Sequence, residues 1–213
     1  MIRAVLFDLD GTLLYTLPDM AAALNAALAS RGFPARTLSE VRGFVGNGVR
    51  KLVERACPPG TDEAAREAVY REYERRYAAH WRDSTAPYPG IPELLGALRR
   101  RGIAAATVTN KAHGDAAAMM EHFFGPLIAH TEGKKDGRPT KPGPESAFAA
   151  LAALGVSPGE ALYVGDSGVD AQTGENAGMD TVLVSWGYWD EERLQSCRAR
   201  GIIHTPAELL DYL

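Results

Sequence analysis

Two carboxylates one residue apart, Asp8 and Asp10, are the residues of this chain best suited to chemistry. They follow the apolar run Ala4–Phe7, which predicts a strand, and Gly11 allows a sharp backbone turn directly after them. Side chains alternate along a strand, so the two carboxylates share a face if the extended backbone continues to Asp10. One could then attack as a nucleophile while the other transfers a proton, with a cation bringing a phosphate group close to both. A solvent-exposed Asp-Gly turn is the alternative interpretation of the same residues.

A hydroxyl group follows a second predicted strand. The run Ile103–Val108 is apolar and leads into Thr109 and Asn110. The carboxyl ends of parallel strands line the crevice in which open α/β sheets bind ligands, so Thr109 is placed to contact one. A helix that begins near Lys111 would add backbone N–H groups for an anion. Alternatively, Thr109 is an ordinary cap of that helix.

A lysine and two more aspartates complete the set of candidate residues. Two of the three residues that follow Lys141, Pro142 and Pro144, are prolines that stiffen the backbone positioning its ammonium group. Asp166 follows the apolar run Ala161–Val164 and is predicted to bind a metal, and Asp170 lies one helical turn later on the same side. Taken singly, these residues could form a turn and a helix cap. A parallel sheet, however, would bring all of the candidates to one edge, namely Asp8, Asp10, Thr109, Lys141, Asp166 and Asp170.

The elements that must position these residues alternate in type. Further strands are predicted at Leu127–Ala129 and Thr181–Val184. Helices are predicted between the strands at Gly114–Phe124, Pro144–Leu154 and Val169–Ala177. Strands that alternate with helices predict an α/β fold with a Rossmann-like parallel sheet covered on both faces.

Residues 15–84 have a different pattern and predict an inserted, all-helical domain. Helices are expected at Asp19–Ser30, from about Gly48 to Ala56, and from Asp62 to about Trp81. Tyrosines three or four residues apart in the last of these helices favour core packing over a ligand site. The predicted domains are therefore a catalytic core, residues 1–14 and 85–213, and a helical cap, residues 15–84.

The composition limits the classes of partner. The chain of 213 residues carries a net charge of −4, which gives no indication of a nucleic-acid or anionic-membrane surface. Cys57 and Cys197 have no metal-ligand spacing, and packing residues in a reducing compartment are favoured over a disulfide. No apolar run has the length of a membrane span, and the first residues do not resemble a signal peptide. We therefore expect a soluble, cytoplasmic protein, either a monomer or a homodimer.

The chain resembles the haloacid dehalogenase-like hydrolase superfamily over nearly its whole length. The motifs that carry the resemblance occur in order as Asp8-Leu9-Asp10-Gly11-Thr12, Val108-Thr109-Asn110, Lys141-Pro142 and Gly165-Asp166-Ser167-Gly168-Val169-Asp170. The helical insertion is similar to the C1-type cap of that superfamily. Within it, residues 44–56 resemble the phosphoglycolate phosphatase branch.

The resemblance implies a role for each motif residue. Asp8 would attack phosphorus and form an aspartyl-phosphate, and Asp10 would protonate the leaving group and then activate water. Mg²⁺ would be held by the Asp8 carboxylate, the Asp10 carbonyl and Asp166. Thr109 and Lys141 would hold the phosphoryl oxygens, with Asn110 beside them as a substrate-binding residue. Asp170 would orient Lys141 or support the metal.

Substrate choice is expected to depend on the helical insertion. Gly46 and Asn47 precede a helix whose first turn could bind an anion, and Arg42, Arg50 or Lys51 could bind a substrate carboxylate. The alternative is a linker whose basic residues face water. Two features depart from the family pattern: Tyr15-Thr16 replaces the usual Asp-Ser, and Glu132–Arg138 is a long polar segment that we interpret as a solvated loop or a flap.

The sequence thus predicts a Mg²⁺-dependent phosphatase of a small phosphorylated metabolite, with 2-phosphoglycolate as the first candidate. A pyrophosphatase, a 5′-nucleotidase or a sugar phosphatase of the same superfamily remains an alternative. A phosphomutase is disfavoured because the insertion offers no evident acid–base partner. A non-catalytic binding module is disfavoured because no motif residue is lost. A P-loop phosphotransferase is excluded because Gly43–Lys51 lacks the required spacing.

Overall fold

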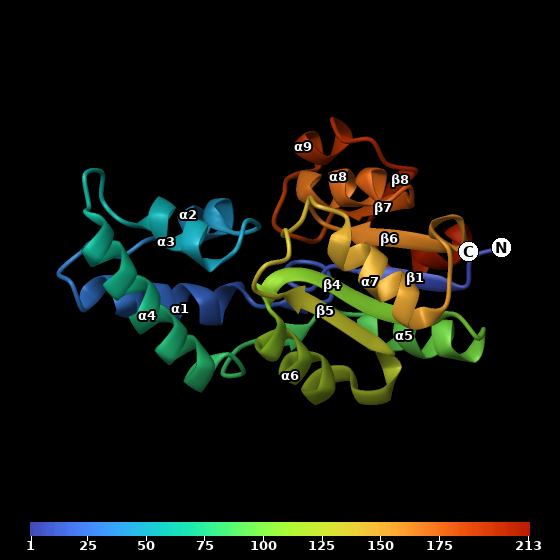
Figure 1. Cartoon of the computed structure of the whole chain (residues 1–213), viewed down its shortest axis with the longest axis horizontal. Coiled ribbons are helices and arrows are strands. Elements are labelled where there is room, and N and C mark those ends of the chain that lie inside the picture. The colour runs from blue at the N-terminus through green and yellow to red at the C-terminus, as the bar shows by residue number, and fades with distance from the viewer. The chain divides into compact units, whose positions relative to one another are not determined.

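The computed structural model describes all 213 residues and divides into two compact units (Figure 1). The core unit comprises Met1–Leu14 and Pro87–Leu213, and the helical unit comprises Tyr15–Ala86. The chain passes between the units twice, through β2 (Leu14–Tyr15) and β3 (Ala86–Pro87), which pair as a two-stranded sheet. None of the helices combines the length and the apolar character that a membrane span requires.

The core unit is built on a six-stranded sheet with the order β5-β4-β1-β6-β7-β8, and all of its neighbouring strands are parallel. The strands are β1 (Ala4–Phe7), β4 (Ala104–Ala112), β5 (His130–Lys134), β6 (Ala161–Gly165), β7 (Asp180–Val184) and β8 (Gly201–Ile203). In the central strand, Phe7 lies opposite Thr107 on one side and Val164 on the other. The loops that follow β1, β4 and β6 therefore leave the sheet at the same edge. The predicted α/β fold class is confirmed.

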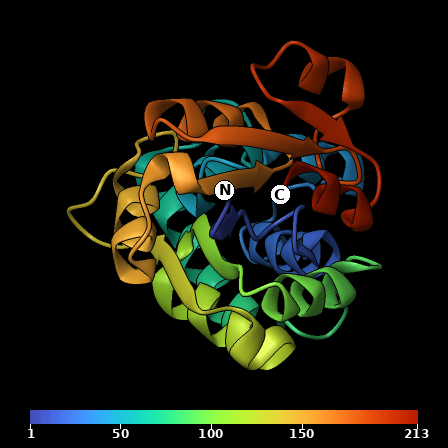
Figure 2. The ribbon, with the colours of Figure 1, turned by 90° about the vertical axis from the view of Figure 1, so that its right-hand side faces the viewer.

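Helices cover both faces of this sheet (Figure 2). They are α5 (Ile91–Arg100), α6 (His113–Phe124), α7 (Glu145–Leu154), α8 (Gly168–Asn176) and the short α9 (Glu191–Gln195). Leu6, Val108 and Tyr163 belong to the buried cluster that packs against α7. On the opposite face, the Thr107 hydroxyl lies 3.1 Å from the Met120 sulfur of α6. Both chain ends lie close together on the core unit, as Figures 1 and 2 show.

The end of β4 differs from the prediction. The strand continues beyond Val108 to Ala112, so Thr109, Asn110 and Lys111 lie in it, and α6 begins at His113. The extension has a pairing partner, because Ala112 lies opposite Lys134 of β5 after a shift in register. Apolar periodicity could not reveal this, since the added residues are mostly polar.

The strand predicted at Leu127–Ala129 is wrong. Gly125–Leu127 is a short 3₁₀ helix, and β5 begins later, at His130. Gly125 has a positive φ of 48° and precedes a proline, which ends α6 in a tight turn. Because β5 has the polar sequence HTEGK, it carries no hydrophobic pattern that could have identified it. The short β8 was not predicted either. The remaining 3₁₀ segments of the core are Pro158–Glu160 and Pro206–Tyr212.

The helical unit contains α1 (Leu17–Ala29), α2 (Leu38–Phe44), α3 (Val49–Ala56) and α4 (Glu63–His80). The seven-residue α2 was not predicted, although Thr37 and Glu40 form a capping box at its start. Tyr73 and Tyr77 of α4 are buried and stack with ring centroids 5.6 Å apart, which confirms that these two tyrosines pack in the core. Cys57 is buried in this unit, and both cysteines are free thiols.

A buried carboxylate ties the beginning of the helical unit to its end. Asp19, in the first turn of α1, accepts hydrogen bonds from the backbone N–H of Ser84 at 3.0 Å and of Thr85 at 2.8 Å. The Thr85 hydroxyl donates a third bond to the same oxygen at 2.8 Å. Asp19 is 4% exposed, and three donors offset the cost of burying its charge.

Candidate active site

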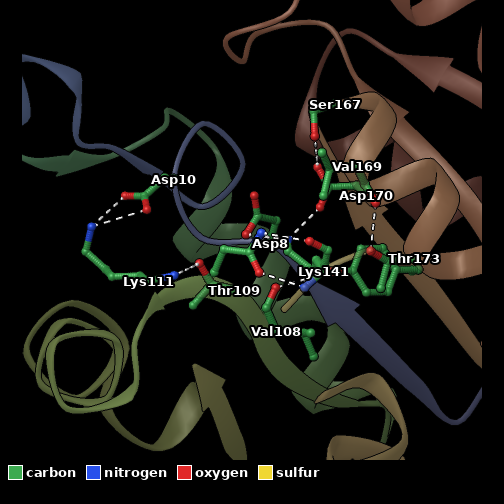
Figure 3. A network of polar contacts seen from close by, with 12 residues as sticks. Asp8, Asp10, Val108, Thr109, Lys111, Lys141, Ser167, Val169, Asp170 and Thr173 are labelled. Carbon is green, nitrogen blue, oxygen red and sulfur yellow. Dashed lines mark hydrogen bonds and ion pairs between the residues drawn. The ribbon is translucent and has the colours of Figure 1, made fainter. Parts of the chain in front are cut away.

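The centre of the site is a lysine between two carboxylates. Lys141 Nζ lies 2.8 Å from Asp8 Oδ1 and 2.7 Å from Asp170 Oδ1 (Figure 3). Asp8 directly follows β1, and its backbone N–H donates to the Val164 carbonyl at 2.9 Å, which fixes the start of the loop against β6. All three side chains are buried. The two aspartates and the lysine therefore form a buried, charge-assisted network.

Burial and the neighbouring charges strongly shift the pKa values of Asp8, Asp166 and Lys141. Burial raises the pKa of Asp8 to about 7; Lys141 opposes the shift, while Asp170 adds to it. Burial also raises the pKa of Asp166 well above its usual value, and Asp170 and Asp8 raise it further. Burial alone would lower the pKa of Lys141, but the carboxylates of Asp170 and Asp8 raise it well above its ordinary value. The neighbouring carboxylates thus hold the lysine as a cation, while burial favours the neutral forms of Asp8 and Asp166.

Asp170 is fixed through both of its oxygens. Its Oδ1 contacts Lys141, and its Oδ2 accepts a hydrogen bond of 2.6 Å from the Ser167 hydroxyl. A Cβ atom on Gly165 would lie 2.2 Å from Asp170 Cγ, so only glycine allows α8 to bring this carboxylate so close to β6. This arrangement suits the predicted role of Asp170 in orienting Lys141.

Asp166 is enclosed by the backbone of two other loops. Its Oδ2 accepts a hydrogen bond of 2.6 Å from the backbone N–H of Tyr188. A Cβ on Gly11 would lie 2.3 Å from Asp166 Oδ2, and one on Gly187 would lie 2.2 Å from Asp166 Cβ. The sequence prediction did not include Gly187 or Tyr188. Their position directly after β7, at the same edge of the sheet, was the available signal.

Three of the carboxylates can offer ligands to one cation. The ligand oxygens of Asp8, Asp166 and Asp170 all lie within 4.8 Å of one another, and all three residues are buried. Carboxylate oxygens are the ligands that hard divalent cations prefer. The residues present therefore fit a metal site. The side chain of Asp10, by contrast, lies outside this group.

Asp10 is paired with a lysine that was not among the predicted site residues. Lys111 Nζ contacts both of its carboxylate oxygens, at 3.1 and 3.2 Å (Figure 3). Because β1 ends at Phe7, the extended backbone does not continue to Asp10, and the condition for Asp8 and Asp10 to share a strand face is not met. Strand alternation could have identified Lys111, since it shares a face of β4 with Thr109.

Thr109 and Asn110 hold the backbone around these lysines. The Thr109 hydroxyl accepts a hydrogen bond of 3.2 Å from the Lys111 backbone N–H. The Asn110 side chain bonds both backbone groups of Lys141, donating to its carbonyl at 3.1 Å and accepting from its N–H at 2.8 Å. Asn110 thus positions Lys141, while its predicted contact with substrate stays a prediction.

The Glu132–Arg138 segment is folded onto a buried carboxylate. Glu132 is 4% exposed and accepts bonds from Lys135 at 2.9 Å and from Arg138 at 2.7 Å. His130 lies 3.0 Å from its other oxygen. The interpretation as a solvated loop is therefore wrong for Glu132, because β5 includes this residue and its ion pairs fold the segment back on the strand.

The candidate residues of the helical unit lie on a charged surface. Arg50 Nη1 is 2.7 Å from Glu67, and its guanidinium lies 4.2 Å from the centroid of the Tyr70 ring. Lys51 Nζ is 2.8 Å from Glu54. The side chains of Arg50 and Lys51 are 58% and 55% exposed. Both are ion-paired, so binding a substrate carboxylate would require exchange of partners.

The loop before α3 is organised by an arginine outside the predicted set. Arg55 donates to the Phe44 carbonyl and to Asn47 Oδ1, both at 2.8 Å. Gly46 has a φ of 116°, a conformation that favours glycine. As predicted, Gly46 and Asn47 immediately precede the start of α3, for which Gly48 is the N-cap.

The similarity of this chain to known proteins identifies its family. The sequence profile of the haloacid dehalogenase-like hydrolases matches residues 5–184, which contain all of the candidate site residues. The chain belongs to the haloacid dehalogenase-like hydrolases. Its helices α1–α4 are consistent with the C1-type cap of these hydrolases.

Relatives place this hydrolase in the phosphoglycolate phosphatase-like branch. It is 36% identical to a phosphoglycolate phosphatase of Rhodospirillum rubrum, covering 100% of this chain and 91% of the relative. It is 34% identical to an N-acetylmuramic acid 6-phosphate phosphatase of Pseudomonas aeruginosa, covering 100% and 95%. A crystal structure of a predicted phosphoglycolate phosphatase from Haemophilus somnus superposes with a TM-score of 0.92 at 27% identity, covering 99% of this chain and 97% of that one.

Proposed function

We propose that this hydrolase is a Mg²⁺-dependent phosphatase that acts on a small phosphorylated metabolite through an aspartyl-phosphate on Asp8. The observation that carries the proposal is the position of Asp8: its buried carboxylate contacts Lys141 and belongs to a cluster of three potential metal ligands. A nucleophile beside fixed positive charge is what phosphoryl transfer requires, because negative charge must be stabilised on the transferring oxygens.

The first step forms the covalent intermediate. An oxygen of Asp8 attacks phosphorus, a P–O bond to Asp8 forms, and the ester P–O bond breaks. Asp10 in its protonated form donates its proton to the leaving oxygen, so the product departs as a neutral alcohol and Asp10 is left as a carboxylate. Lys141 and the Thr109 hydroxyl stabilise the phosphoryl oxygens, and Asp170 keeps the lysine ammonium in place.

The second step returns the enzyme to its starting state. Asp10, now a carboxylate, takes a proton from water as the water oxygen attacks phosphorus. The P–O bond to Asp8 breaks and inorganic phosphate leaves, which restores the Asp8 carboxylate.

A divalent cation fits between the aspartates. Asp8 and Asp166 would hold Mg²⁺, together with the Asp10 carbonyl, and Asp170 would support the site. When bound, the cation neutralises charge on the phosphate and keeps Asp8 ionised in spite of its burial.

The relatives support two substrate candidates. The phosphoglycolate phosphatase relatives favour 2-phosphoglycolate, with Arg50 or Lys51 proposed to bind its carboxylate and Gly46 and Asn47 shaping the adjoining loop. The N-acetylmuramic acid 6-phosphate phosphatase of similar identity favours a carboxylated sugar phosphate instead. Both substrates are phosphomonoesters that carry a carboxylate, so the same basic residues could serve either.

Phosphate release from a panel of substrates with Mg²⁺ tests the proposal. The panel contains 2-phosphoglycolate, N-acetylmuramic acid 6-phosphate, glucose 6-phosphate, nucleoside monophosphates and pyrophosphate, each also assayed with the Asp8→Asn variant. We expect one of the carboxylated monoesters to have the highest kcat/KM, and the variant to release no phosphate. Turnover by Asp8→Asn at the wild-type rate would overturn the covalent mechanism.

A further inference from the structure

We infer that Lys111 is a positioning residue that holds the carboxylate of Asp10 in place for both proton transfers. The inference rests on the proposed phosphatase function and adds to it a residue outside the motif positions that carry the family resemblance. A single ammonium group contacts both oxygens of Asp10, at 3.1 and 3.2 Å, and thereby restrains the rotation of the carboxylate as well as its position.

Both side chains of the ion pair are largely shielded from water. The side chain of Lys111 is 5% exposed and that of Asp10 is 13% exposed. Pairs on a protein surface are screened and exchange their partners readily, whereas a pair removed from water keeps its geometry. The long, flexible side chain of Lys111 is therefore held in one conformation.

The backbone beneath Lys111 is also constrained. Its N–H donates to the Thr109 hydroxyl at 3.2 Å. On the other side, Gly133 of β5 packs so closely that a Cβ there would lie 2.7 Å from the Lys111 carbonyl oxygen and 2.6 Å from His113 Cα. The strand pairing and this close approach fix the backbone position of Lys111, and the contacts with Asp10 fix the position of its ammonium group.

The two lysines of the site contact different carboxylates. Lys141 is shared by Asp8 and Asp170, while Lys111 serves Asp10. The nucleophile and the proton-transfer group thus have different cationic partners. Loss of Lys111 should impair proton transfer specifically and leave phosphate binding largely intact.

The alternative is that Lys111 binds the substrate directly. Asp10 must face the leaving oxygen, so an ammonium beside it could also contact an anionic group on the leaving side. In that case Lys111→Met would raise KM for carboxylated substrates only. A positioning residue would instead lower kcat and leave KM nearly unchanged.

The test compares Lys111→Met, Lys111→Arg and Asp10→Asn with the wild-type enzyme on 2-phosphoglycolate and on p-nitrophenyl phosphate. p-Nitrophenolate is a good leaving group that needs no proton, so Asp10 assists only the second step with that substrate. The matched control is Lys134→Met, an exposed lysine at the end of β5 with the same charge change.

For Lys111→Met we expect kcat on the alkyl phosphate to fall about 10- to 100-fold, with KM within about twofold of wild type. With p-nitrophenyl phosphate we expect a burst of nitrophenol followed by slow turnover, because formation of the intermediate stays fast while its hydrolysis slows. Lys111→Arg should retain most of kcat, and Lys134→Met should be unchanged. Adding Lys111→Met to Asp10→Asn should cost little more, since the lysine acts through Asp10.

The inference is overturned if the losses of Lys111→Met and Asp10→Asn multiply, or if only KM changes. A crystal structure of Lys111→Met gives a readout independent of activity, and we expect the Asp10 carboxylate to be displaced. An unmoved Asp10 would refute the inference even if the enzyme is a phosphatase. Absence of turnover by the wild type would instead refute the proposed function, and the structure would still decide the role of Lys111.

Discussion

The core unit and the helical unit use charged residues in opposite ways. In the core site, Lys141 and Lys111 are almost completely buried, and each is in contact with carboxylates that are themselves buried or nearly so. In the helical unit, Arg50 and Lys51 are more than half exposed and pair with glutamates on the same surface. The first arrangement costs desolvation energy and allows one geometry, whereas the second costs little and can rearrange.

We expect this difference to divide the work of the enzyme: the core site carries out catalysis, and the helical unit selects the substrate. A buried, fully partnered network can hold reacting groups in fixed positions, and substitutions in it should change kcat by orders of magnitude. Exposed ion pairs can exchange one anion for another, and substitutions there should change which substrate binds.

Asp8→Asn should reduce turnover to near the background rate, because an amide cannot form the acyl phosphate. Phosphate release measures the loss, and mass spectrometry of acid-quenched wild-type enzyme should detect a phosphorylated peptide that contains residue 8. Asp136→Asn, an exposed aspartate of the same unit, is the control and should retain full activity. A phosphopeptide in the Asp8→Asn variant would contradict the assignment.

Removal of metal should also abolish activity, and Mg²⁺ should restore it. EDTA treatment followed by readdition of Mg²⁺ tests this in the phosphate-release assay. Asp166→Asn should weaken Mg²⁺ binding measured by isothermal titration calorimetry, because it removes a charged ligand. Activity that survives EDTA would argue against the cation between Asp8 and Asp166.

Asp10→Asn should lower kcat by roughly 10²- to 10⁴-fold, the usual loss for a general acid–base group. The deficit in forming the intermediate should shrink on an aryl phosphate, whose leaving group requires no proton. Single-turnover kinetics separates that step from hydrolysis of the intermediate. Equal deficits in the first step on alkyl and aryl substrates would rule out the acid role of Asp10.

The smallest effects are expected in the helical unit. Arg50→Ala or Lys51→Ala should raise KM for 2-phosphoglycolate several-fold and leave kcat nearly unchanged, since any contact with the carboxylate is remote from the reacting atoms. Arg71→Ala is the matched control, because Arg71 pairs with the same Glu67 at 3.1 Å. Equal rises in KM for a substrate without a carboxylate would contradict the proposed recognition.

The core of the fold could be predicted because its strands are apolar and end in functional motifs. Ala4–Phe7 and the run from Ala161 carry this signal, and the structure has strands at both. β5 could not be found in this way, since its sequence is polar and its position depends on pairing with β4. The extension of β4 to Ala112 depends on the same pairing.

The site was partly predictable for a related reason. Asp8 and Asp166 come together, as expected of residues that follow neighbouring strands, and they are joined by Lys141 from the loop before α7 and Asp170 from α8. The partner of Asp10 was not predicted, because a helix was expected to begin near Lys111, whereas Lys111 lies in β4. The close approach of Gly11 and Gly187 to Asp166 was also not predicted, since contact between distant backbone segments is a tertiary property that one sequence does not reveal.

The hydrogen bonds of Asp19 have a consequence for the evolution and engineering of this chain. Because that carboxylate fastens the first turn of α1 to Ser84 and Thr85, the helical unit begins and ends at one place. We expect a segment closed in this way to tolerate a change of length, or exchange for that of a relative, without displacing β1 and β6, which precede Asp8 and Asp166. Selection for a new substrate could therefore change the helical unit while the catalytic core unit stays the same.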